Sequence, residues 1–132
     1  MDYTIKQAAE RVHLTTHTLR YYDKEGLLPF VHRNNTGNRI FTDSDLEWLG
    51  LICCLKDTGM SIKQIGIYIQ WCMEGDSSVE ARLNLLIQHR EAVIHQMKVL
   101  QQNLRVIDKK IAHYNTRCSL PVKDDDYVLV EG

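Results

Sequence analysis

The chain has 132 residues, a formal net charge of −1 and a sequence pI of about 6.6. This length suits one domain with a modest core, or a small domain followed by a long helix. The near-neutral balance excludes a globally basic surface. Any binding of nucleic acid would therefore have to rest on a local cluster of cations.

The four cysteines, Cys53, Cys54, Cys72 and Cys118, form neither a CxxC pair nor a regular disulfide framework. The opening segment M-D-Y-T-I-K lacks the pattern of a signal peptide, and no apolar run is long enough to span a bilayer. We therefore expect a reduced, cytoplasmic protein with mostly free thiols and no membrane contact.

Two short helices are expected at the start of the chain. Thr4 and Gln7 form a capping-box pattern at the beginning of a helix over residues 4–12. The stretch 15–29, T-T-H-T-L-R-Y-Y-D-K-E-G-L-L-P, predicts a second helix with Thr15 as its N-cap and Gly26 just past its end. Two short helices with a tight connection predict a helix-turn-helix, whose second helix is the recognition helix.

The predicted recognition helix has one apolar and one polar face. Leu19 and Tyr22 are three residues apart and can share the buried stripe. The opposite face carries Thr16, His17, Arg20, Tyr21 and Lys24. Such a face fits a DNA major groove, although many polar helix faces are simply solvated.

A β-hairpin is predicted after the recognition helix. Phe30, Val31, Ile40 and Phe41 flank the turn-forming segment H-R-N-N-T-G-N-R, with Arg33 and Arg39 on the two arms. A hairpin beside a helix-turn-helix is a wing, and its arginines can bind phosphates or enter a minor groove. The alternative is an ordinary surface hairpin.

A second pair of helices follows the wing. Thr42 caps a third helix that ends near residue 58, and Ser61 and Gln64 form another capping-box pattern, for a fourth helix that ends near residue 72. Lys56 lies near the C-terminus of the third helix, where a cation is favoured and where it could also meet a phosphate.

A long helix is predicted after a hinge at residues 73–76, with Ser77 and Glu80 at its start. Its apolar residues recur at alternating steps of four and three, a heptad seam of roughly 36 residues. The preceding domain is too small to cover this seam, so we expect a partner helix from a second copy. The predicted dimerisation residues are Leu86, Val93, Met97, Leu100, Leu104, Ile107 and Ile111.

These patterns predict a mainly α fold with three parts. A winged helix-turn-helix DNA-binding domain spans residues 1–74, a dimerising coiled-coil helix spans residues 77–115, and a C-terminal tail spans residues 116–132. The tail contains an acidic run and a short apolar patch, Tyr127 to Val130.

The R-Y-Y-D-K-E-G-L-L-P recognition helix, the wing, the second helix pair and the long helix resemble the MerR family of bacterial transcription regulators over residues 3–114. The resemblance implies a homodimer with an antiparallel coiled coil. It also implies binding to a pseudo-palindrome in a promoter whose spacer is too long, with activation by bending and untwisting that DNA for RNA polymerase. The implied DNA-binding positions are Arg20, Tyr21, Arg39 and Lys56, with Thr16, Tyr22 and Arg33 as further candidates.

The segment L-I-C-C-L-K-D-T-G-M-S resembles a short branch of the family that responds to aldehydes and other electrophiles. That resemblance implies Cys54, two residues before Lys56, as the sensing thiol, and a nearby cation favours the reactive thiolate. The alternative is that Cys54 is a small buried hydrophobe. Metal-sensing relatives hold soft ions with a cysteine pair after the long helix, where this chain has Cys118, so we predict no metal and no cofactor.

Other functions remain open at this point. The same fold could sense a small ligand without covalent chemistry, in a pocket between the long helix, the second helix pair and the tail. It could also be an architectural DNA binder without an effector. A thiol redox enzyme using Cys53 and Cys54 is disfavoured because there is no CxxC motif or partnering acid–base pair, and we predict that the protein is not an enzyme.

Overall fold

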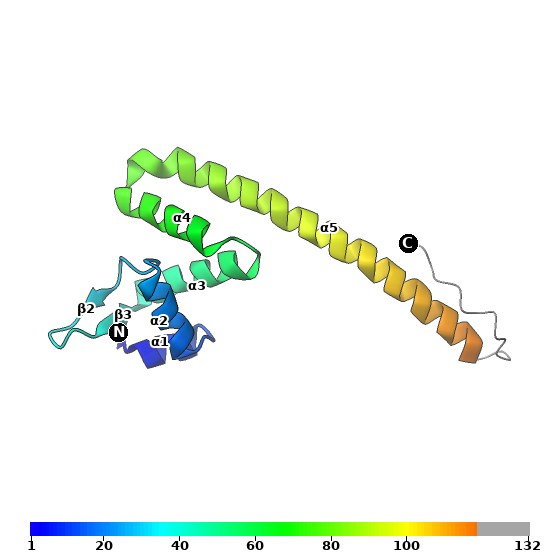
Figure 1. Cartoon of the computed structure of the whole chain (residues 1–132), viewed down its shortest axis with the longest axis horizontal. Coiled ribbons are helices and arrows are strands. Elements are labelled where there is room, and N and C mark those ends of the chain that lie inside the picture. The colour runs from blue at the N-terminus through cyan, green and yellow to red at the C-terminus, as the bar shows by residue number, and fades with distance from the viewer. Residues whose placement is uncertain (119–132) are drawn as a thin grey trace. The chain divides into compact units, whose positions relative to one another are not determined.

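A computed structural model gives the structure of the chain and describes residues 1–118 (Figure 1). The described residues form two compact units, residues 1–89 and residues 90–118. The apolar patch predicted in the C-terminal tail lies outside the described residues. Residues 116–118, which the sequence placed in that tail, instead complete the last helix.

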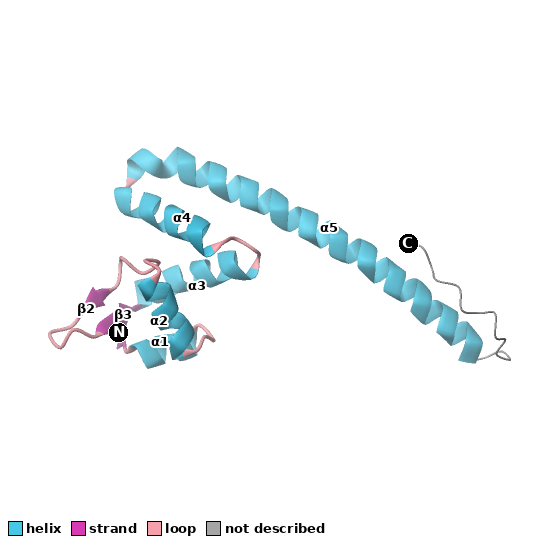
Figure 2. Ribbon diagram, viewed as in Figure 1, coloured by secondary structure: helices cyan, strands magenta, loops and turns pink. Residues whose placement is uncertain are grey.

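The described part of the chain is mainly helical, with a small sheet near its start (Figure 2). In chain order the elements are β1 (Asp2–Tyr3), α1 (Ile5–Arg11), α2 (Thr16–Lys24), β2 (His32–Arg33), β3 (Arg39–Thr42), α3 (Asp43–Asp57), α4 (Ile62–Glu74), the 3-10 turn η1 (Asp76–Ser78) and α5 (Val79–Cys118). The predicted fold class, a winged helix-turn-helix followed by a long helix, is confirmed.

The predicted N-caps are present because each depends on residues only three positions apart. Thr4 Oγ1 accepts from the Gln7 backbone N–H at 3.2 Å, and Gln7 Oε1 accepts from the Thr4 N–H at 2.9 Å, which completes the capping box of α1. Thr15 Oγ1 accepts from the Thr18 N–H at 3.0 Å and so caps α2. These caps satisfy N–H groups that have no partner within the helix.

Two expectations at helix starts need correction. Ser61 accepts from the Gln64 N–H at 3.1 Å, but the return bond of a capping box is absent from the described contacts of α4. Ser77 does not cap the long helix, because the turn η1 precedes α5. The neighbouring Ser78 is buried instead, and its hydroxyl donates to the carbonyls of Trp71 and Gly75.

The sheet has the strand order β1-β3-β2 with antiparallel pairs throughout. Strand β1, which the sequence did not predict, pairs Tyr3 with Phe41 across 38 residues of chain. The Tyr3 hydroxyl also donates to Asp43 Oδ1 at 2.8 Å. The wing is therefore anchored through β3 to the beginning of the chain.

One hydrophobic core holds the first unit together. Its fully buried large side chains are Leu19, Leu27, Leu28, Phe41, Leu49, Ile52, Met60, Ile65 and Ile69. They come from α2, the segment after it, β3, α3, the α3–α4 connection and α4. Leu85 and Leu86 on the first turns of α5 pack against this core, so the first unit extends to residue 89, beyond the predicted domain limit at 74.

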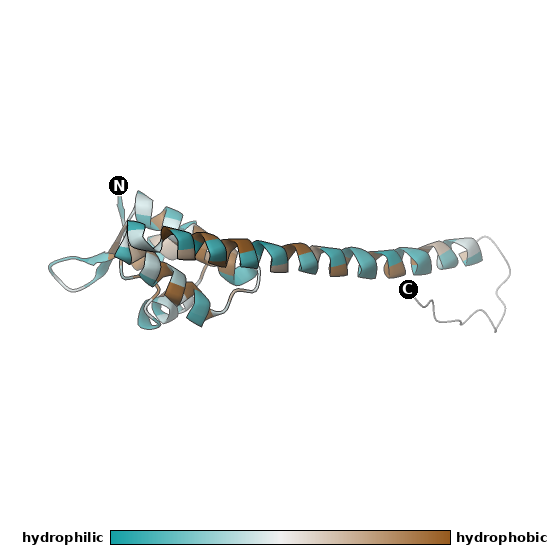
Figure 3. Cartoon of the chain, turned by 90° about the horizontal axis from the view of Figure 1, so that it is seen from above, coloured by the Kyte–Doolittle hydropathy of each residue, from teal (hydrophilic) through white to brown (hydrophobic). Residues whose placement is uncertain are grey.

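Helix α5 has an apolar stripe that its own chain leaves largely uncovered. Apolar residues recur along the helix in Figure 3. The exposed members of the predicted seam include Met97, Leu100, Leu104, Ile107 and Ile111, whereas Leu86 and Val93 are partly buried. No residue of α5 is fully buried, so the helix has no core of its own within the described chain.

Candidate nucleic-acid interface

The recognition helix α2 is fixed by its apolar face and presents polar residues outward. Leu19 is completely buried, whereas Arg20 and Tyr21 are exposed and Thr16 is half-buried. Tyr22 was predicted to share the buried stripe of α2 with Leu19, which the structure confirms, and it was also a further candidate for DNA contact, which stays a prediction. Only 6 % of its surface is exposed, and burial raises the pKa of its phenol, so its ring belongs to the core and not to the outward face.

The wing is a short hairpin whose turn is organised by one asparagine. Asn34 Oδ1 accepts from the backbone N–H groups of Thr36 and Asn38 at 3.1 and 3.0 Å. Gly37 has a φ of 84°, a conformation that favours glycine. On the two arms, Arg33 and Arg39 are directly opposite each other in the strand register.

The two wing arginines have different surroundings. Arg39 donates from Nε to Asp23 Oδ2 at 3.2 Å, its Nη2 lies 2.9 Å from Asp23 Oδ1, and its Nη1 donates to the Val31 carbonyl. Arg33 donates to the Gly37 carbonyl at 2.7 Å, and its Nη2 lies 3.9 Å from Asp23. The side chain of Arg33 is 55 % exposed, compared with 21 % for Arg39.

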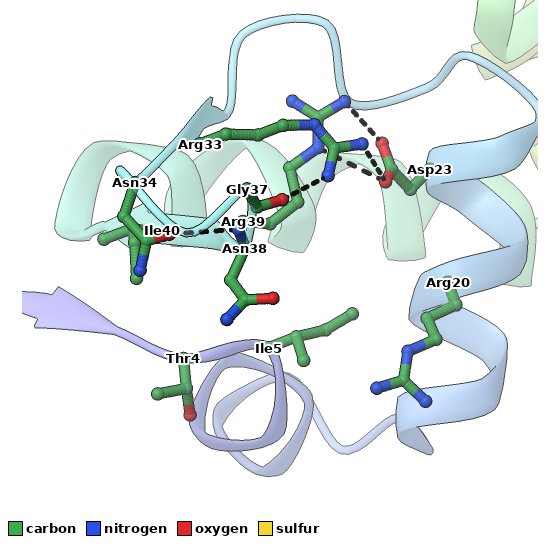
Figure 4. A pocket seen from close by; sticks show the side chains of 10 residues that line it. All are labelled: Thr4, Ile5, Arg20, Asp23, Arg33, Asn34, Gly37, Asn38, Arg39 and Ile40. Atoms are coloured by element: carbon green, nitrogen blue, oxygen red, sulfur yellow. Dashed lines mark hydrogen bonds and ion pairs between the residues drawn. The ribbon is translucent and has the colours of Figure 1, made fainter.

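Arg20, Asp23 and the wing line one hollow with a volume of about 460 Å³ (Figure 4). In the figure, Arg33 and Arg39 reach from the wing toward Asp23 on α2, and Arg20 lies one turn earlier on the same helix. The start of α1 forms the remaining wall with Thr4 and Ile5. The structure thus brings together three of the predicted DNA-binding residues.

Asp23 was not singled out by the sequence reasoning, although it lies within the R-Y-Y-D-K-E-G motif. The only available signal was one carboxylate on a helix face otherwise rich in cations. Its partner Arg39 is 16 residues away, and nothing in the local sequence shows that the hairpin folds back onto α2.

Two further predicted positions lie on α3, away from this hollow. Lys56 is exposed in the last turn of the helix. Cys54 is also exposed in the single chain, so it is not buried in the core of the first unit. Its neighbour Cys53 is half-buried, and burial, followed by the nearby Asp57 carboxylate, raises the pKa of that thiol.

The described helices and side chains show two further features. Within residues 1–118, none of the helices combines the length and apolar character that a membrane crossing requires. In the same part of the chain, His, Cys, Asp and Glu side chains form no group of three or more that could hold a metal ion.

An outward-facing helix beside a basic wing defines a winged helix-turn-helix protein, and comparison with known proteins agrees. The family model described as MerR HTH family regulatory protein matches residues 3–70. This chain belongs to the MerR family of transcriptional regulators, a DNA-binding family without enzymatic activity.

Two curated relatives support the assignment. The chain is 46% identical over 114 residues to an HTH-type transcriptional regulator of Haemophilus influenzae, covering 86% of this chain and 84% of that protein. It is 40% identical over 90 residues to the HTH-type transcriptional regulator AdhR of Bacillus subtilis, covering 68% and 64%.

Solved structures show the same architecture. HiNmlR, a MerR family regulator lacking the sensor domain and bound to promoter DNA, has a TM-score of 0.84 and 44% identity, with 91% of this chain and 95% of that chain covered. A MerR family regulator from Bacillus thuringiensis has a TM-score of 0.79 and 47% identity, with 85% and 98% covered.

Proposed function

We propose that this protein is a homodimeric, cytoplasmic regulator that binds a pseudo-palindromic operator within a promoter. In this proposal it activates transcription by bending and untwisting an over-long spacer, which brings both promoter elements onto one face for RNA polymerase. The observation that carries the proposal is the outward face of α2, with Arg20 and Tyr21 exposed beside a basic wing (Figure 4). HiNmlR, at 44% identity, is bound to promoter DNA.

Local charge and not overall charge supports DNA binding by this surface. The whole chain carries a net charge of −1, so phosphate attraction must be local, and the predicted sources are Arg20, Arg33 and Arg39 around the hollow and Lys56 on α3. Arg20 on α2 is suited to a base edge or a phosphate, while Lys56 in the last turn of α3 is suited to a phosphate. A dimer would present each of these residues twice to a two-fold symmetric site.

The uncovered stripe of α5 supports the dimer. Met97, Leu100, Leu104, Ile107 and Ile111 are all more than half exposed in the single chain. Their spacing of alternating three and four residues is that of a coiled-coil seam. A second copy is the simplest partner, because it supplies an identical stripe and the two-fold symmetry that a pseudo-palindrome requires.

The proposal is tested with the promoter adjacent to the gene. Gel-shift titration and footprinting should give one protected site between the two promoter elements, and in vitro transcription should rise when the protein is in its active form. Shortening the spacer to the ordinary length should make transcription independent of the protein. Protein-independent output from the native spacer, or no site-specific protection, would contradict the proposal.

For the effector, we propose an electrophile that modifies Cys54. The thiol is exposed on α3, and access is one requirement of a reactive cysteine. Thr58 Oγ1 donates to the Cys54 carbonyl at 2.7 Å and lies 2.7 Å from His89 Nε2 on α5. The turn that carries Cys54 is therefore hydrogen-bonded to the first turns of the long helix.

Promoter output with and without a reactive aldehyde tests the thiol assignment. Cys54→Ala should keep operator binding and lose induction, whereas Cys53→Ala, Cys72→Ala and Cys118→Ala should keep both. Full induction in Cys54→Ala would exclude the thiol. A non-covalent ligand would then be the better account, or an architectural role if no compound changes the output.

A further inference from the structure

We infer that Asp23 is a positioning residue for DNA recognition. Its carboxylate fixes the wing against the recognition helix, holds Arg39 in a structural pair and leaves Arg33 as the wing arginine that meets DNA. This inference rests on the proposed DNA binding and reverses the expected roles of the two arginines. It assigns a function to an acidic residue at the edge of a surface that binds a polyanion.

The outer strand of the wing has little support from the sheet because it is short. Strand β2 has two residues, which pair with Ile40 and Arg39 on β3. Strand β1 pairs with the other end of β3, at Phe41 and Thr42, so the sheet anchors β3 but leaves β2 as a short edge strand. In addition, Arg33 and Arg39 are direct cross-strand partners, and like charges in that position repel each other.

Asp23 supplies the support from α2. Both of its carboxylate oxygens face Arg39, one at 2.9 Å from Nη2 and the other at 3.2 Å from Nε. The two side chains are each 21 % exposed, so solvent screens this pair less than a fully exposed one. Two parallel contacts between a guanidinium and a carboxylate also fix orientation, which a single contact would not.

This arrangement leaves the two arginines unequal toward DNA. The Nε, Nη1 and Nη2 atoms of Arg39 all have protein partners, and the carboxylate offsets its charge. Arg33 is 55 % exposed; its Nη1 donates to the Gly37 carbonyl at 2.7 Å, and its Nη2 lies 3.9 Å from Asp23. A phosphate can therefore replace the long contact of Arg33 at little cost, whereas it would have to break the short pair of Arg39.

The direction in which one substitution changes the affinity for the operator distinguishes this role from simple charge repulsion. If Asp23 only repelled phosphates, Asp23→Asn would tighten binding to every DNA sequence. If Asp23 positions the wing, the same variant releases Arg39 and loosens the hairpin. Operator affinity should then fall, while affinity for random DNA should stay the same or rise.

The experiment measures the Kd of the full chain for its operator and for random duplex DNA over a series of salt concentrations. Asp23→Asn should weaken operator binding by about three- to tenfold, which lies in the lower part of the range of coupling between residues in contact. Glu25→Gln is the matched control, because Glu25 is exposed at the C-cap of the same helix. The control should bind operator as tightly as the unaltered protein, or slightly more tightly.

Substitution of the two wing arginines provides an independent test. Arg39→Gln should weaken operator binding without changing the slope of log Kd against log salt, because no phosphate contact is lost. Arg33→Gln should reduce that slope by about one. The double variant Asp23→Asn/Arg39→Gln should bind no more weakly than the weaker of its two single variants, since both remove the same pair.

Several outcomes would overturn the inference. The first is operator binding by Asp23→Asn that is as tight as that of the unaltered protein, or tighter. The second is a slope of log Kd against log salt that falls by about one in Arg39→Gln. The third is a loss of operator affinity in the double variant that equals the product of the losses in the two single variants. Circular dichroism of each variant establishes that it is folded, and the Arg39→Gln slope decides the question even if Asp23→Asn does not fold. If the unaltered protein binds operator and random DNA equally, the proposed function itself fails.

Discussion

Charges introduced into the stripe of α5 should separate the dimer while leaving the single chain folded. The perturbation is Leu100→Glu combined with Leu104→Glu. These residues are 67% and 54% exposed in the single chain, so little packing within the chain is lost. In the proposed dimer the same residues would lie in the seam.

The magnitude follows from the exposed surface that remains to be covered. Complete burial of a leucine side chain contributes about 1.5–3 kcal/mol. Scaling by the exposed fractions of Leu100 and Leu104 and counting both protomers gives about 4–7 kcal/mol for the dimer. This corresponds to a dissociation constant weaker by about 10³- to 10⁵-fold, before any repulsion between the new carboxylates.

Sedimentation equilibrium at micromolar concentration measures the change. The unaltered protein should sediment as a dimer and the double variant as a monomer with much weaker operator binding. The matched control is His95→Glu combined with Gln102→Glu, which places two carboxylates seven residues apart on exposed positions outside the stripe. A monomeric unaltered protein would exclude the proposed dimer, and a Leu variant that remains a dimer would exclude these residues from its seam.

Three further predictions concern single side chains. Arg20→Ala should cost about 1–3 kcal/mol of operator binding and relax the preference at one base position, whereas Lys56→Ala should weaken binding to all sequences and reduce the salt slope by about one; equilibrium titrations distinguish the two. The raised pKa of Cys53 keeps it mostly protonated at neutral pH, so in a Cys54→Ala background its alkylation should be slow at pH 7 and accelerate as pH rises; fast labelling at pH 7 would contradict this. Leu19→Ala should lower the free energy of unfolding by about 2–5 kcal/mol in urea titrations, because Leu19 is completely buried.

The sequence by itself determined the features that depend on neighbouring residues. The caps by Thr4, Thr15 and Thr42 each join residues three positions apart, so their donors and acceptors meet whenever the helix forms. Gly26 has the predicted left-handed conformation, with a φ of 81°. The apolar spacing of α5 likewise predicted one long helix, because helical periodicity is a local property.

Tertiary structure decided which face of each element is covered and which charges are paired. Leu86 and Leu100 belong to the same predicted seam of α5, but Leu86 packs against the core of the first unit, whereas Leu100 is 67 % exposed. Strand β1 has two residues, and only its pairing with β3 across the chain creates it. Contacts of this kind join distant segments, so no local pattern in the sequence predicts them.

The wing shows the same division most clearly. Hairpin-forming residues predicted its existence and placed Arg33 and Arg39 on its arms, and residue type alone made the two arginines equivalent. The fold makes them different, because Asp23 on α2 lies 2.9 Å from Arg39 and 3.9 Å from Arg33. Coulomb attraction and hydrogen bonding depend on these distances, and the distances exist only once the hairpin is folded against the recognition helix.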